Sequence, residues 1–96
     1  MPSCLTHTGR VPIIHQERVS LLIEIASKEV LADKETVKYM TEAETRGAVR
    51  EYVIATLFDR ELKARLSCPV IQKSLKQMGC VELDEESIYK FLTVSQ

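Results

Sequence analysis

Three cysteines and two histidines are the side chains in this chain best suited to bind a metal or act as nucleophile and base. Cys4 and His7 have a Cys-x-x-His spacing, which suits two ligands of one zinc ion. A zinc site needs about four ligands, and close pairs on both sides would be strong evidence. Cys68 and Cys80 lie twelve positions apart and form no second pair. The sequence therefore predicts neither a metal site nor a bound cofactor.

Cys68 has one feature of a reactive thiol, because Pro69 directly after it suits the first turn of a helix. The positive end of a helix dipole there would favour the thiolate. A nucleophile also needs a base within reach, and nothing in the sequence places His7 or His15 near Cys68. The glycine-rich, nucleophile-elbow and zinc-protease motifs are absent as well. We therefore predict a noncatalytic protein.

The composition is that of an ordinary globular domain. The chain has 96 residues, 45% of them hydrophobic, and a formal net charge of -1. Such a chain is long enough for one small core, and its charge provides no general attraction to nucleic acid. No apolar run reaches the roughly 18 residues that a transmembrane helix needs. An odd number of cysteines fits free thiols, and the beginning of the sequence lacks a signal-peptide pattern, so we expect a cytoplasmic protein without membrane contact.

Residues 1–14 are predicted to form an irregular N-terminal arm, and residues 15–96 a single helical domain. Within the arm, the patch at 11–14 either docks against the core or forms a brief edge strand. A first amphipathic helix is expected from about His15 to Leu31, and Asp33 is expected to cap a short helix after it.

The segment from Thr41 to Leu66 is predicted to form one long central helix. Thr41 and Glu44 match a capping box at its start. Within this segment, Tyr52–Phe58 is also compatible with a buried strand, because it is apolar and β-branched. Helix is favoured there, since helix-forming residues flank it on both sides. The predicted fold is all-α, a compact bundle of four to five helices around a long central helix, and the alternative is α+β with a strand at Tyr52–Phe58.

Two further helices are expected in the C-terminal third. The first begins at Pro69 after a cap at Ser67 or Cys68 and ends at Gly79. Asp84 then caps the last helix, whose inward-facing residues are predicted to be Ile88, Phe91 and Leu92.

Apolar residues occupy more helix faces than a domain of this size needs for its own core. In the long helix, Val49, Val53 and Leu57 form one row. A second row at the same spacing lies on another side and comprises Ile54, Phe58, Leu62 and Leu66. The alternative is that the helical bundle itself buries both rows, without a partner. The residues predicted to form an interface are Leu21, Ile25, Ile54, Phe58 and Leu62.

These observations predict a small noncatalytic helical interaction module, such as an adaptor, a chaperone-like protein or a regulatory subunit. A homodimer is the simplest arrangement, because two-fold self-association is the commonest oligomer. The alternative is a small nucleic-acid-binding transcriptional regulator that uses a basic region. A helix-turn-helix is disfavoured, since its second helix would open with acidic residues after Asp84. The basic region comprises Arg60, Lys63, Arg65, Lys73 and Lys76.

Overall fold

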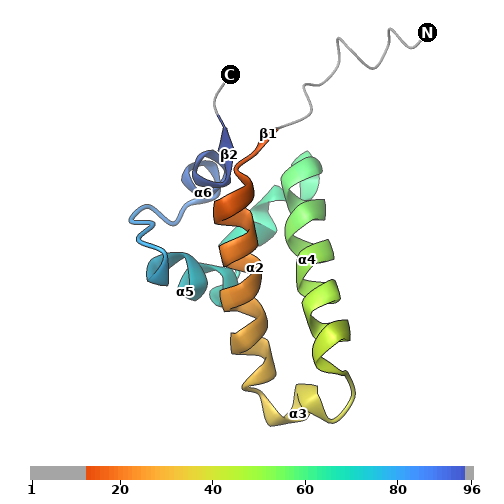
Figure 1. The fold of residues 1–96 in the computed structure, drawn as a ribbon. Helices are drawn as coiled ribbons and strands as arrows, with labels where there is room; N and C mark the ends of the chain where they lie inside the picture. Colours follow the sequence, from red (N-terminus) through yellow and green to blue (C-terminus); the bar gives the residue numbers. More distant parts are fainter. Residues whose placement is uncertain (1–12, 95–96) are drawn as a thin grey trace, which may run out of the picture.

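The computed structural model describes residues 13–94 and is mostly helical (Figure 1). This part of the chain has five α-helices, one 3₁₀ helix and a two-stranded ribbon, which confirms the predicted all-α class. The elements are β1 (Ile13–Ile14), α2 (Gln16–Leu31), α3 (Lys34–Val37), α4 (Glu42–Phe58), η1 (the 3₁₀ helix, Arg60–Ser67), α5 (Pro69–Gln77), α6 (Glu85–Leu92) and β2 (Thr93–Val94).

Helices α2 and α4 run side by side in opposite directions, and α3 connects them at one end (Figure 1). His15 caps α2, since its Nδ1 accepts a hydrogen bond from the backbone N–H of Arg18. Asp33 caps α3 as predicted, through a bond from the N–H of Glu35. The chain reverses direction between the end of α2 at Leu31 and the start of α4 at Glu42, and the cap at Asp33 lies within this connection.

The capping box at the start of α4 is confirmed. The Thr41 hydroxyl accepts a bond from the N–H of Glu44, and the Glu44 carboxylate accepts one from the N–H of Thr41. Tyr52–Phe58 lies within α4. The α+β alternative is therefore wrong, and the helix formers flanking this apolar segment decide its conformation.

The predicted continuous helix from Thr41 to Leu66 is also wrong, because α4 ends at Phe58. Asp59 has an extended backbone, with φ -112° and ψ 114°, and its carboxylate accepts a bond from the N–H of Glu61. Asp59 therefore ends one helix and caps the next. The residues after it form η1, in which hydrogen bonds join residues three rather than four positions apart.

The remaining helices begin and end close to the predicted residues. Pro69 occupies the first turn of α5, after Cys68 at the capping position. Gly79 follows that helix with a positive φ of 90°, which glycine adopts without steric cost. Asp84 caps α6 through the N–H of Ser87, while Ile88 and Leu92 are buried and Phe91 is half-buried.

The two ends of the described chain pair with each other. Strand β1 is antiparallel to β2, and Ile13 lies opposite Val94. Of the patch at 11–14, Ile13–Ile14 forms the predicted brief strand, and Ile14 also packs against the core, as the other alternative predicted. The rest of the predicted N-terminal arm, with Cys4 and His7, lies outside the described residues.

One hydrophobic core joins α2, α4, η1, α5 and α6. Leucine, isoleucine and valine make up most of it, as a chain with few aromatic residues requires. The break at Asp59 divides the second predicted row. Phe58, at the end of α4, is exposed, whereas Leu66, in η1, is fully buried. The buried apolar residues are Val19, Leu22, Ala26, Val53, Leu57, Leu66, Ile71, Leu75, Cys80, Ile88 and Leu92.

Candidate functional site

The predicted interface residues are distributed over α2, α4 and η1. Leu21 and Phe58 are each 47% exposed. Ile25, Ile54 and Leu62 are half-buried, and Ile54 packs against the core. Because the backbone changes direction at Asp59, Phe58 and Leu62 do not continue one helical row. The five side chains remain a predicted interface, but Ile54, Phe58 and Leu62 do not form the continuous row that the sequence predicted.

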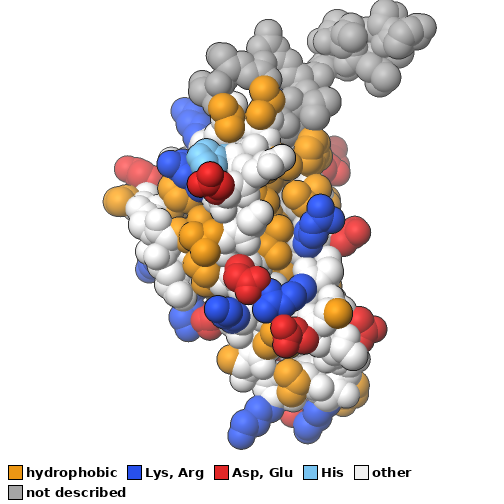
Figure 2. All heavy atoms as spheres, viewed as in Figure 1, with side chains coloured by type: hydrophobic (Ala, Val, Ile, Leu, Met, Phe, Trp, Pro, Cys, Tyr) orange, Lys and Arg blue, Asp and Glu red, His pale blue; other side chains and the backbone are white. Residues whose placement is uncertain are grey.

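Two of the five residues in the predicted basic region are engaged with carboxylates. Lys63 Nζ lies 2.6 Å from Glu86 Oε1 and over the Tyr89 ring, and its side chain is only 18% exposed. Lys73 Nζ lies 3.0 Å from Glu29 Oε2. The other three, Arg60, Arg65 and Lys76, are exposed. Charges of both signs are interspersed over the face of α2 and α4 that Figure 2 shows.

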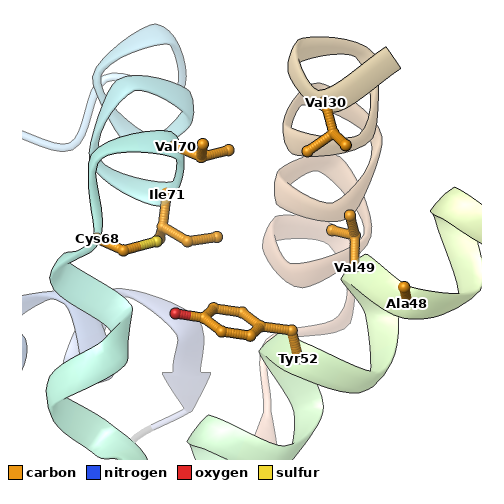
Figure 3. Close-up of a pocket in the computed structure, with 7 residues that line it drawn as sticks. All are labelled: Val30, Ala48, Val49, Tyr52, Cys68, Val70 and Ile71. Atoms are coloured by element: carbon orange, nitrogen blue, oxygen red, sulfur yellow. The ribbon is translucent and has the colours of Figure 1, made fainter. Parts of the chain in front are cut away.

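An apolar groove lies where α2, α4 and α5 meet, and Figure 3 shows its walls. Its volume is about 330 Å³, and it is open to the surface. Val70, at the start of α5, is 38% exposed at this groove. The groove is lined by Val30, Ala48, Val49, Tyr52, Cys68, Val70 and Ile71.

Local sequence explains how each wall forms. Ala48, Val49 and Tyr52 lie on one side of α4, because residues four positions apart share a helix face. On the opposite wall, Pro69 starts α5 directly after Cys68, so the first turn of α5 presents Val70 and Ile71 to the groove. Val30 near the end of α2 completes it. The groove thus combines residues from three helices that are distant in sequence.

Tyr52 closes one end of the groove, and its hydroxyl is already used. The hydroxyl donates a hydrogen bond to the backbone oxygen of Arg65, at 3.0 Å. Burial, together with the neighbouring Cys68, raises the pKa of Tyr52 to about 12. The other lining side chains are hydrocarbon or thiol. The groove therefore favours an apolar occupant over one that needs hydrogen bonds.

The structure separates the residues considered for thiol chemistry. Cys68 lines the groove with Val30, near the C-terminal end of α2, whereas His15 caps the N-terminal end. At 1.5 Å per residue the intervening helix spans about 20 Å, so His15 cannot act as a base for Cys68. Cys80 is buried, its Sγ lies 3.2 Å from the backbone oxygen of Glu82, and burial raises the pKa of its thiol.

Within residues 13–94, no three histidine, cysteine, aspartate or glutamate side chains are grouped as metal ligands. Over the same range, no helix is both long enough and apolar enough to cross a bilayer.

Sequence reasoning missed the groove. Its α4 wall includes Val49, which belongs to the first predicted row, but Val30, Cys68 and Val70 belong to other helices. The available signal was Val70 directly after the helix-starting Pro69, a position that the first turn leaves near the surface. Comparison with known proteins assigns neither a family nor a function, since no protein-family model, curated protein or solved structure matches this chain.

Proposed function

We propose that this protein is a noncatalytic helical interaction module whose groove between α2, α4 and α5 receives apolar side chains of a protein partner. The observation that supports this proposal is the open groove of about 330 Å³ with its almost wholly apolar lining. An exposed concave apolar surface is costly in water unless a partner covers it for part of the time.

The lining favours a protein over a small polar ligand. Small-molecule sites usually combine apolar walls with a few polar groups that orient the ligand. Here the Tyr52 hydroxyl is engaged with Arg65, and six of the seven lining side chains lack oxygen and nitrogen. A leucine or phenylalanine side chain of a partner needs no such group, and its full burial contributes about 1.5–3 kcal/mol.

The simplest partner is a second copy of this chain, in a homodimer. Roles as an adaptor, chaperone-like protein or regulatory subunit fit such a module. A cytoplasmic setting is part of the proposal, and it agrees with free thiols at Cys68 and Cys80.

Light scattering over a range of concentrations tests self-association, with Val70→Glu as the groove variant. Glutamate is compatible with the first turn of α5, because the helix dipole favours a negative charge there. We expect the wild-type mass to double with concentration and Val70→Glu to remain monomeric. Val81→Glu is the matched control, since Val81 is 89% exposed and lies outside the groove lining, and it should associate like the wild type.

Ile25→Glu and Phe58→Glu test the interface predicted from the sequence. If either of these variants were monomeric while Val70→Glu remained dimeric, the dimer interface would lie at Ile25 or Phe58 and not at the groove. A wild-type protein that is monomeric at every concentration would exclude the homodimer.

A further inference from the structure

The 3₁₀ helix η1 is unusual for its length and composition. It extends over eight residues, Arg60–Ser67, whereas 3₁₀ runs longer than about four residues are uncommon. Its sequence, RELKARLS, consists mainly of strong α-helix formers. Local preference therefore favours an α-helix here, continuous with α4. Contacts outside the segment must account for the observed conformation.

At its start, η1 depends on Asp59. The Asp59 carboxylate accepts a bond from the N–H of Glu61 at 2.9 Å, and this cap requires the extended backbone that interrupts α4. An α-helix through this position would lose the cap and gain intrahelical bonds in its place.

Polar contacts to η1 come from α4 and α6, and α5 also packs against it. The Tyr52 hydroxyl of α4 donates to the backbone oxygen of Arg65, at 3.0 Å. From α6, Glu86 pairs with Lys63, whose ammonium also lies 4.4 Å from the centre of the Tyr89 ring. Leu66 is the only fully buried side chain in η1. A few polar contacts and one buried leucine thus fix the segment.

The same segment sets the shape of the groove. Tyr52 lines the groove and also bonds Arg65, and η1 leads directly into Cys68 and Val70 on the opposite wall. A 3₁₀ helix rises about 2.0 Å per residue and an α-helix about 1.5 Å. Conversion of η1 to an α-helix continuous with α4 would place residues 52 and 65 about 20 Å apart along one helix axis. That change would displace the α5 wall relative to Tyr52.

We propose that η1 is a conformational switch that couples α4 to the groove. In the 3₁₀ form the groove has the shape described above. In the α form, η1 joins α4 and the Tyr52–Arg65 bond is broken. An apolar occupant that contacts Tyr52 and Val70 together stabilises the 3₁₀ form, because only that form holds both walls in place. The regulatory role rests on the proposed docking function, whereas the two conformations are properties of the free protein.

Tyr52→Phe tests the switch in the free protein, because it keeps the ring in the groove and removes the hydroxyl. We expect amide hydrogen exchange in residues 60–67 to accelerate about fivefold relative to exchange in the core helices, the effect of one lost hydrogen bond. Tyr39→Phe is the control and should change nothing, since Tyr39 is 80% exposed and, within residues 13–94, its hydroxyl has no hydrogen-bond partner. Unchanged exchange across 60–67 in folded Tyr52→Phe would overturn the proposal.

Asp59→Ala provides a second, structural readout. Removal of the cap should produce nuclear Overhauser contacts between residues four positions apart across residue 59 and through η1, which α-helix gives and 3₁₀ helix does not. A folded Asp59→Ala protein that retains only the three-residue contacts would contradict the switch. Both experiments use the protein without a partner. They can therefore contradict the switch without contradicting the docking proposal, and light scattering can exclude the homodimer without contradicting the switch.

Discussion

The hairpin of α2 and α4 has two ends that are stabilised in different ways. At the end near the β1–β2 ribbon, Val19, Leu22 and Leu57 are buried. At the other end, α3 has no buried residue, and Val37 and Tyr39 are exposed. The same two helices thus belong to a packed core at one end and to a thinly covered surface at the other.

The difference arises from what covers each end. Helix α6 packs near the ribbon end, whereas α5 lies against the C-terminal half of α2, where Lys73 pairs with Glu29 and Val70 lies at the groove with Val30. At the α3 end, the caps at Asp33 and Thr41 and the pairing of Arg46 with Glu24 add to the burial of Thr45. The α3 end is therefore stabilised less by apolar burial, and more by capping, than the ribbon end.

The largest effect is expected for a cavity at the ribbon end. Leu22→Ala should lower the free energy of unfolding by about 3 kcal/mol, since Leu22 is fully buried and its neighbours cannot collapse completely. Val37→Ala, at the opposite end, should change it by no more than about 0.5 kcal/mol. Urea denaturation measures both. Similar losses in the two variants would show that the ends are not stabilised differently.

Removal of the α4 cap should have an intermediate effect. Thr41→Ala removes the acceptor for the N–H of Glu44 and should cost about 1 kcal/mol in urea denaturation. Thr41→Ser keeps the hydroxyl and should restore most of the loss. If alanine were as stable as serine here, capping would not be what stabilises the α3 end.

The smallest effect is expected on acidification. The ammonium of Lys63 holds the pKa of Glu86 below its ordinary value of 4.5. A carboxyl pKa that is lower in the folded state adds stability above the ordinary pKa, and this stability is lost as the pH falls through the folded-state value. The urea midpoint should therefore fall less in Glu86→Gln than in the wild type between about pH 6 and about pH 3. Equal decreases would exclude a contribution from the Lys63–Glu86 pair.

Much of the fold follows from local sequence signals. The capping box at Thr41, the caps at Asp33 and Asp84, and Gly79 after α5 all lie where the sequence predicts them. Each is a local interaction between residues a few positions apart, so sequence spacing is enough to find it.

The break at Asp59 could not be found in that way. The residues of η1 prefer α-helix, and the contacts from Tyr52 and Glu86 that oppose this preference come from other helices. The groove has the same origin, because Val30, Val49 and Val70 meet only after three helices have packed. Periodicity identified the apolar face with Val53 and Leu57 correctly, but it wrongly continued a second row through Asp59 and could not show which faces other helices would cover.

The β1–β2 ribbon has a consequence for how this molecule folds. Its pairing joins Ile13 to Val94, so nearly the whole described chain forms the loop that this contact closes. The bonds from His15 N–H and the Arg18 guanidinium to the backbone oxygens of Leu92 and Phe91 close the same loop. Contacts between distant residues pay a large loop-closure entropy, and they become favourable only after the intervening segments are compact. The ribbon should therefore form late in folding, as the step that follows assembly of the helices.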